Sequence, residues 1–235
     1  MKIGVISDVH NNLLALKTIM EKFNNEKVDK ILCAGDLLGL GPNPNEVIDH
    51  IMNLDNFYCV LGNHDRYLTE GLPKTFPNEE KMDKEEYEHH KWEHNLLNEE
   101  EKEYLNNLPL YKEIIINKHK ILLVHYFYND NKKYIDILKD YSNINLDDKN
   151  YDIIIFGHDH KRVIKEINNK LLINPGSLGC PSKDKNIARG LILDINENIN
   201  VKEIDIEYDV DKVKKKMDSL NYPSKDIIKK IFYGS

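Results

Sequence analysis

Short apolar runs alternate with helical patterns along the first part of the chain. The runs are rich in Val and Ile, are bounded by Gly, Asp or Asn as buried strands should be, and cover residues 3–6, 31–34, 58–61, 121–124 and 153–156. Between the early runs, apolar residues recur at helical spacing over 13–23 and 46–52. Strands that alternate with helices predict right-handed crossovers and a sheet whose first strands are parallel.

The second half of the chain is predicted to form β-hairpins. Strand-like runs flank short polar turns in three places, at 113–117 with 121–124, 163–167 with 171–173, and 190–195 with 199–206. A mixed sheet, or two sheets packed face to face and covered by helices, follows from this order. Two helices are expected near the end of the chain, over 210–220 and 224–232.

Residues 68–110 differ in composition from the rest and are predicted to form a helical cap insertion. Charged residues are dense over 78–88, and a helical pattern covers 91–108. His90 and His94 stand four apart on one helix face, a spacing that suits a metal site. The surrounding Glu and Lys residues favour a solvated helix face for His89, His90 and His94 instead.

Composition indicates one globular domain over 1–235, with its C-terminal helices in 207–235. The chain has 40% hydrophobic and 31% charged residues and a mean hydropathy of -0.58. Its net charge of -7 argues against long nucleic acid as a partner, and the basic segment 212–216 is interpreted as a solvated helix face. No apolar run reaches membrane-span length and the start lacks a signal-peptide pattern, so we expect a cytoplasmic protein without a membrane partner. Three scattered cysteines indicate buried reduced thiols.

Polar clusters directly follow the apolar runs. They are Asp8-Val9-His10, Gly35-Asp36, Gly62-Asn63-His64-Asp65, His125, Gly157-His158-Asp159-His160 and Asn174-Pro175-Gly176-Ser177. Asp, Asn and His bind borderline divalent cations, and the carboxyl ends of strands meet at one edge of a sheet. The clusters therefore predict a hydrolytic centre with two cations about 3.5–4 Å apart.

The spacing within two clusters suggests how the side chains point. Asp8 and His10 are two apart, so an extended chain would send both to one face. His158 and His160 repeat the spacing, with Asp159 pointing away towards neighbouring groups. Two divalent cations, two carboxylates and a bridging hydroxide leave about one positive charge, which favours an anionic phosphate ester and lowers the pKa of bound water.

The pattern Asp-x-His, Gly-Asp, Gly-Asn-His-Asp, His and Gly-His-x-His resembles the calcineurin-like metallophosphoesterase superfamily. The Asn-Pro-Gly-Ser segment further resembles its compact bacterial and archaeal branch of small phosphodiesterases, which includes diadenosine-tetraphosphate-hydrolase-like members. The likeness runs from residue 1 to about 205. It implies an α/β fold, a four-layer α/β/β/α sandwich of mixed sheets flanked by helices.

The resemblance also implies residue roles. The first metal would be held by Asp8, His10 and His160, the second by Asn63, His125 and His158, and Asp36 would bridge them. His64 would serve as general acid or electrostatic donor to the leaving oxygen, with Asp65 orienting its imidazole. The turn at 174–177 would give backbone support near the metals.

Further residues are candidates for contact with substrate. Asn63, His64, Arg66, Gly176 and Arg189 could meet the phosphate, although a surface salt bridge is the favoured interpretation of each arginine alone. Tyr126 either lines the pocket and stacks on a base or fills the sheet edge, and we favour packing.

The leading hypothesis is a metal-dependent phosphoesterase that hydrolyses a small phosphodiester, phosphomonoester or dinucleoside polyphosphate by attack of a metal-bridging hydroxide. Manganese is the favoured metal, and Fe, Zn, Co or Ni also suit these ligands. The alternatives are a protein-binding scaffold of the same fold, or a protein phosphatase. The intact Gly-Asn-His-Asp motif favours an enzyme, and the acidic cap favours a closed site for a small, for example nucleotide, substrate.

Overall fold

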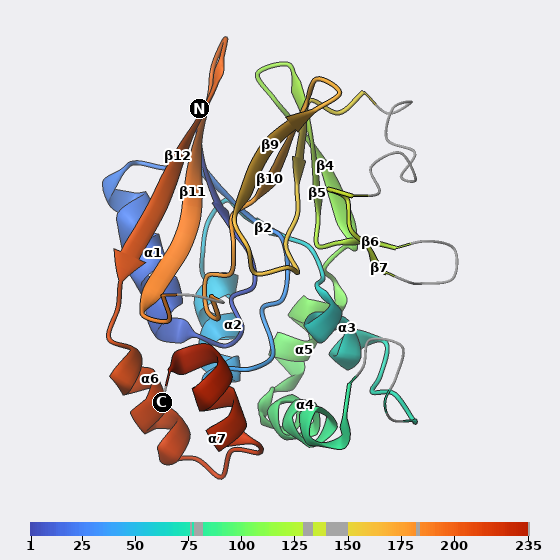
Figure 1. Cartoon of the computed structure of the whole chain (residues 1–235), viewed down its shortest axis with the longest axis vertical. Helices are drawn as coiled ribbons and strands as arrows, with labels where there is room; N and C mark the ends of the chain where they lie inside the picture. The colour runs from blue at the N-terminus through green and yellow to red at the C-terminus, as the bar shows by residue number, and fades with distance from the viewer. Residues whose placement is uncertain (76, 78–81, 129–133, 140–149, 182–183, 235) are drawn as a thin grey trace.

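The computed structural model describes residues 1–75, 77, 82–128, 134–139, 150–181 and 184–234, and its core is a pair of five-stranded sheets (Figure 1). The first sheet has the order β12-β11-β1-β2-β3. The three strands of this sheet that come first in the sequence are parallel, as predicted. They are β1 (Lys2–Ile6), β2 (Lys30–Cys33) and β3 (Phe57–Cys59). The antiparallel hairpin of β11 (Ile187–Ile195) and β12 (Ile199–Glu207) extends the sheet beside β1.

The second sheet has the order β4-β5-β8-β10-β9. Three parallel strands form its centre, namely β5 (His119–Val124), β8 (Ile153–Ile155) and β10 (Lys170–Asn174). Its edges are the hairpin partners β4 (Tyr111–Ile116) and β9 (Val163–Ile167). All three predicted hairpins are confirmed. A small ribbon of β6 (Phe127–Tyr128) and β7 (Tyr134–Ile135) lies beside this sheet.

The alternation of side chains along β1 explains how the layers pack. Ile3 and Val5 point between the sheets, where they meet Ile121 and Ile153 in one apolar cluster. Ile6 lies in a second cluster, formed with the helices α1 (Leu13–Asn25) and α2 (Pro44–Met52). This places the two helices on the outer face of the first sheet.

The outer face of the second sheet carries a third apolar cluster. Leu122, Ile154 and Leu172 form it from the three central strands, and Ile137 and Tyr151 cover them from loop segments. Three apolar layers therefore separate the helices, the two sheets and this cover. The expected α/β fold of mixed sheets flanked by helices is confirmed.

The remaining helices gather at the lower end of the molecule in Figure 1. The predicted cap region contains α4 (Lys84–Leu96) and α5 (Glu99–Asn106), and α3 (Asn63–Thr69) leads into it. The C-terminal part forms α6 (Val210–Asp218), α7 (Lys225–Ile228) and a π-helical turn, η3 (Lys229–Tyr233). On α6, Val213 and Met217 are buried while Lys212, Lys215 and Lys216 are exposed, which confirms the solvated basic face.

The prediction that His89, His90 and His94 lie on a solvated face of α4 is wrong. His89 and His90 are 1% and 0% exposed, and only His94 reaches solvent in part. The reason is tertiary, because α4 lies between the strand ends and the C-terminal helices. Tyr222, which precedes α7, packs its ring 5.0 Å from that of His89 and 4.8 Å from that of Trp92.

The state of the cysteines and the character of the helices complete the description of the fold. Cys33, Cys59 and Cys180 are buried free thiols, as expected. Among the described residues, no helix is both long enough and apolar enough to span a membrane.

Candidate metal centre

The polar clusters converge where the strands of both sheets end. Asp8, His10 and His160 present ligand atoms that all lie within 4.8 Å of one another, and so do Asp8, Asp36 and His125. These residues follow β1, β2, β5 and β8, so four separate chain segments meet at one edge. The structure thus brings together the candidates that the sequence placed after separate strands.

Left-handed backbone, rather than extended chain, aims these side chains. The prediction that Asp8 and His10 share a face because β1 continues through them is wrong, since β1 ends at Ile6 and the two residues have φ of 54° and 49°. Positive φ also occurs at Asp36 (54°), His158 (74°) and His160 (53°). Such backbone is costly outside glycine and persists where the surroundings fix it. Here the amides of Asp8 and His10 donate to Gly35 O at 2.9 Å and Asp36 O at 3.0 Å.

Hydrogen bonds to backbone carbonyls orient three of the imidazoles. The bonded pairs are His10 Nδ1 with Leu38 O at 2.9 Å, His125 Nδ1 with Ala34 O at 2.6 Å, and His160 Nδ1 with Cys180 O at 2.9 Å. A carbonyl only accepts, so each Nδ1 carries the proton and each Nε2 offers its lone pair to a metal.

Two donor sets share the carboxylate of Asp36. On one side His10 Nε2 lies 3.8 Å from Asp36 Oδ2 and 3.0 Å from His160 Nε2, and His160 Nε2 lies 3.5 Å from Asp8 Oδ1. On the other side His125 Nε2 lies 3.2 Å from Asp36 Oδ2.

Asn63 completes the second set. Its Oδ1 lies 3.1 Å from His125 Nε2 and 2.9 Å from His158 Nδ1. Asp8 Oδ2 is buried and has no hydrogen-bond partner among the described residues, as expected of an oxygen placed for a cation. The arrangement therefore fits two divalent metals.

The electrostatics of the site differ on its two sides. Burial, together with the adjacent His160, lowers the pKa of His10 to about 4, so this ring is a neutral donor. Burial also acts against charge on His125, but Asp36 outweighs it and raises the pKa of His125 to about 10. In the metal-free chain a proton thus lies between His125 and Asp36, where a cation would compete with it.

Glycines allow the close packing around the carboxylates. A Cβ on Gly62 would lie 2.0 Å from Asp36 Oδ1 and 2.4 Å from the Asp36 amide nitrogen. A Cβ on Gly157 would lie 2.0 Å from Ser7 Oγ and 3.0 Å from Asp8 Oδ2. Any side chain at either position would displace a candidate ligand.

Among the described residues, Asp65 makes no hydrogen bond to the imidazole of His64, contrary to the role that the resemblance implied. Its Oδ1 accepts from the amides of Leu37 at 2.9 Å and Leu38 at 3.0 Å, and its Oδ2 accepts from the Gly62 amide at 2.9 Å. Burial and the nearby Asp36 raise the pKa of Asp65 to about 7 in the metal-free chain. Asp65 therefore ties the loop after β2 to the turn before α3.

His64 instead faces α4. Its Nδ1 lies 3.2 Å from His90 Nε2, and His90 Nδ1 lies 2.5 Å from Glu93 Oε1. Burial lowers the pKa of His64 well below its usual range, so the ring is neutral. The sequence pattern did not predict His90 and Glu93 as part of the site, because it favoured a solvated helix face. Their spacing of three on a helix was the available signal.

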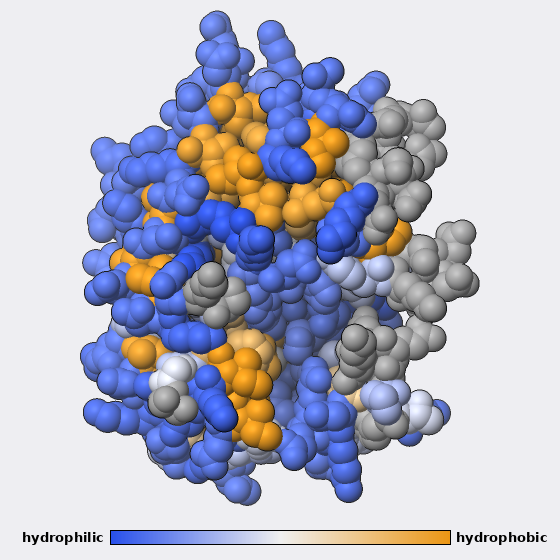
Figure 2. Space-filling model, in the orientation of Figure 1, coloured by the Kyte–Doolittle hydropathy of each residue, from blue (hydrophilic) through white to orange (hydrophobic). Residues whose placement is uncertain are grey.

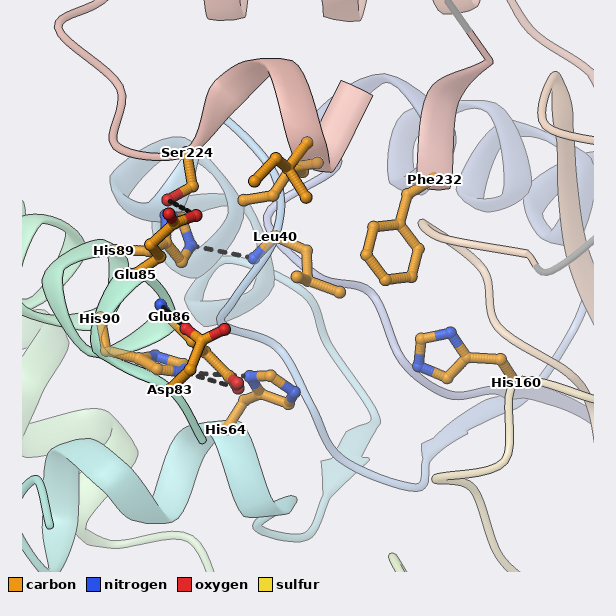
Figure 3. Close-up of a pocket in the computed structure, with 12 residues that line it drawn as sticks. Leu40, His64, Asp83, Glu85, Glu86, His89, His90, His160, Ser224 and Phe232 are labelled. Atoms are coloured by element: carbon orange, nitrogen blue, oxygen red, sulfur yellow. Dashed lines mark hydrogen bonds and ion pairs between the residues drawn. The ribbon is translucent and has the colours of Figure 1, made fainter. Parts of the chain in front are cut away.

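A cavity of about 290 Å³ opens between His64 and His160 (Figure 3). Its walls come from the predicted cap region and the C-terminal helices, and the lining residues include Leu40, Glu86, His90, Ile228 and Phe232. Figure 2 shows a hollow among hydrophilic residues near the middle of this face, with an apolar patch below it over the C-terminal helices. Ile227 and Ile231 of those helices are each 50% exposed.

The candidate phosphate contacts lie in different settings. Arg66 pairs with Glu70, at 2.8 Å from Nε to Oε1, and donates to the Tyr126 hydroxyl at 2.7 Å. Arg189 pairs with Asp184 at 2.6 Å. Gly176 occupies a tight turn with φ of 81° and donates its amide to Asn174 Oδ1 at 2.9 Å.

The turn at 174–177 supports the candidate metal centre through two side chains that donate to backbone carbonyls. Asn174 Nδ2 donates to Gly157 O at 2.8 Å, and Ser177 Oγ donates to Asp8 O at 2.9 Å. These bonds join the segments that carry Asp8 and His158.

Aromatic residues hold His158 from its outer side. Tyr126 is buried and stacks on its ring at 4.9 Å, which agrees with packing as its role. Tyr134 packs 4.7 Å from the same ring and donates its hydroxyl to Asp159 Oδ2 at 2.8 Å. Asp159 thus points away from the candidate ligands and bonds a neighbouring group, as predicted.

The two-sheet fold and the donor sets at its strand ends define a metal-dependent hydrolase. The family model for the calcineurin-like phosphoesterase superfamily domain matches residues 1–198, and the chain belongs to this superfamily. The expected class of enzyme, a metallophosphoesterase, is confirmed with it.

Relatives and solved structures agree with this assignment. The chain is 30% identical to the uncharacterized protein MJ0912 of Methanocaldococcus jannaschii over 92% of this chain and 91% of that protein. It is 28% identical to phosphodiesterase MJ0936 of the same organism, over 75% and 83% of the two chains. The crystal structure of hypothetical protein PH1004 from Pyrococcus horikoshii shares the fold, with a TM-score of 0.83 at 22% identity, over 100% of this chain and 98% of that one.

Proposed function

We propose that this chain hydrolyses a small phosphate ester, with phosphodiesters the favoured class and phosphomonoesters and dinucleoside polyphosphates as further candidates, using two divalent metals. The observation that carries the proposal is the Asp36 carboxylate, whose Oδ2 lies 3.8 Å from His10 Nε2 and 3.2 Å from His125 Nε2. One oxygen between two imidazole donors suits a bridging ligand. A two-metal site of this kind is used for in-line displacement at phosphorus.

The ligands divide into two sets around Asp36. Asp8, His10 and His160 would hold one metal, and Asn63, His125 and His158 would hold the other. When bound, the metals supply a water nucleophile at neutral pH and neutralise phosphate charge. Manganese is the favoured ion, and Fe, Zn, Co and Ni suit the same donors.

His64 is proposed to serve the leaving group. It borders the cavity from the cap side, while His160 borders the same cavity from the side of the metal ligands (Figure 3). A leaving group in this cavity would lie within reach of the His64 ring. Asn63 and His64 are the favoured phosphate contacts, because Arg66 and Arg189 are already paired with carboxylates.

The size and charge of the cavity favour a small substrate over a protein or a nucleic acid. Asp83, Glu85 and Glu86 line it together with apolar residues, and the chain carries a net charge of -7. A long polyanion would be repelled from this rim. A volume of about 290 Å³ suits one compact organic group beside the phosphate.

A substrate panel with several metals tests the proposal. Purified protein is treated with chelator, reloaded with Mn, Fe, Zn, Co or Ni, and assayed on nitrophenyl phosphodiesters and monoesters, cyclic nucleotides and dinucleoside polyphosphates. Elemental analysis gives the metal content, and Asp36→Asn is the control that should lose both metal and turnover. A folded, metal-loaded protein without turnover on any of these esters would favour the scaffold alternative.

A further inference from the structure

Helix α4 places a buried polar pair beside His64. His90 and Glu93 are each 0% exposed and lie three residues apart. His90 Nε2 lies 3.2 Å from His64 Nδ1, and its Nδ1 lies 2.5 Å from Glu93 Oε1. Figure 3 shows His90 on the side of His64 away from His160, so the other nitrogen of His64 points into the cavity.

Glu93 is tied to the loops that carry the metal ligands. Its Oε2 accepts from Asn11 Nδ2 at 2.7 Å and from the Gly39 amide at 2.8 Å. Asn11 follows His10 directly, and Gly39 lies three residues after Asp36. A buried carboxylate with these donors stays ionised and stabilises a positive partner, which here is His90.

We propose that His90 and Glu93 are positioning residues for the hydrolysis, which hold the His64 imidazole with its Nε2 towards the leaving oxygen. The inference rests on the proposed function, because it assigns His64 to the leaving group. It adds that the cap helix α4, and not the neighbouring Asp65, supports His64.

The chain of contacts fixes where the protons lie. Glu93 accepts from His90 Nδ1, and a protonated His90 donates from Nε2 to His64 Nδ1, which leaves the proton of His64 on Nε2. Burial opposes charge on His90, but Glu93 and Glu86 outweigh it and raise the pKa of His90 to about 9.

The proton transfer balances along the same chain. As the bond from phosphorus to the leaving oxygen breaks, the Nε2 proton of His64 passes to that oxygen. The Nε2 proton of His90 moves to His64 Nδ1, so both rings end neutral and His90 remains bonded to Glu93. The attacking water releases one proton to solvent in the same turnover. Solvent returns one proton to His64 Nε2 through the cavity, and the Nδ1 proton of His64 passes back to His90 Nε2, which restores the starting state.

Leaving-group dependence tests the role in catalysis. His90→Ala should lower kcat/KM about 10²-fold for a phenyl phosphodiester, whose leaving group needs a proton, and less than about 3-fold for the dinitrophenyl ester. His94→Ala is the matched control, since His94 lies one turn along the same helix, and both esters should change less than about 3-fold. Glu93→Gln keeps the side-chain size and should show the leaving-group-dependent loss in smaller measure. The double variant of His64→Ala and His90→Ala should be no slower than His64→Ala alone.

Nitrogen NMR of the metal-free protein gives a readout independent of activity. His64 should be neutral with its proton on Nε2 in the wild type, and a mixture of tautomers should appear in His90→Ala and in Glu93→Gln, but not in His94→Ala. A wild-type His64 protonated on Nδ1, equal losses for both esters, or additive effects of the two variants overturns the inference. A wild type inactive on every ester refutes the proposed function, and the NMR result still decides whether His90 and Glu93 set the tautomer of His64.

Discussion

Replacing Asp65 with asparagine removes a buried negative charge that accepts three backbone hydrogen bonds. Oδ1 accepts from Leu37 and Leu38, and Oδ2 accepts from Gly62 at 2.9 Å. Asparagine keeps one oxygen, so the Leu37 and Leu38 amides retain an acceptor. Its NH₂ group then faces the Gly62 amide. Both groups are hydrogen-bond donors, whereas in the wild type the Gly62 amide donates to Asp65 Oδ2.

The size of the loss follows from those contacts. A hydrogen bond to a charged group contributes about 1.5–3 kcal/mol, and a buried amide without an acceptor costs about 1–3 kcal/mol. Burial and Asp36 disfavour the charge on Asp65, so its removal offsets part of that loss, and we expect Asp65→Asn to lower the free energy of unfolding by about 1–2 kcal/mol. Metal binding should weaken as well, because Gly62 precedes Asn63 and Leu37 follows Asp36.

The assay is urea unfolding followed by circular dichroism, with and without Mn²⁺, together with elemental analysis of bound metal. It is run at pH 8, since the pKa of Asp65 is about 7 in the metal-free chain and the carboxylate must be charged. His64→Asn is the control, expected to keep both metals and to lose turnover. If Asp65→Asn unfolds within about 0.5 kcal/mol of the wild type, keeps both metals and only turns over more slowly, Asp65 acts through His64 and the reasoning fails.

Three further predictions concern the metals, His90 and the sheet. Metal at 100 times its Kd should stabilise the wild-type fold by about 2.7 kcal/mol and raise its Tm by about 5–10 °C in calorimetry. The Tm of the control variant Asp36→Asn should not change. If metal leaves the Tm of the wild type unchanged as well, the result counts against the site. The pKa of His90 is about 9 in the folded chain and 6.5 in the unfolded chain. The charge on His90 therefore stabilises the fold fully below pH 6.5, by about 3 kcal/mol, and this stabilisation is lost as the pH rises through 9. Between pH 6 and pH 10, metal-free wild type should therefore lose about 3 kcal/mol more stability than His90→Gln in urea unfolding, since His125 and Asp65 titrate in both proteins, and parallel curves would contradict the charge assignment. Gly4→Ala should cost about 1–3 kcal/mol in the same assay, because its Cβ would lie 2.6 Å from the Phe23 ring, and wild-type stability would show that the ring moves freely.

Local patterns were sufficient for the strands and for most of the donor set. Each candidate ligand directly follows an apolar run, so the run and the ligand are read from one short segment. Parallel strands then bring those segments to one edge whatever the details of packing. For the same reason the three hairpins, with their polar turns, were predicted correctly.

The aim of the ligands was not predictable in this way. Asp8 and His10 were expected to point together because a strand alternates, yet both have left-handed backbone. Hydrogen bonds from their amides to Gly35 and Asp36, which follow a different strand, fix that conformation. The spacing of residues within one segment cannot predict such bonds, because the partners are more than 20 residues apart.

The sequence by itself determined the parallel early strands, the three hairpins and the chemical type of the centre, since these depend on local periodicity and on residues that adjoin each strand. Only the tertiary structure decided which polar residues serve the site. Asp65 adjoins His64 in sequence but bonds the loop after β2, while His90 and Glu93 reach His64 from a helix whose pattern resembled a solvated face. The sequence of a polar helix face is the same whether water or other parts of the protein cover it. Here the strand ends and Tyr222 cover the face of α4.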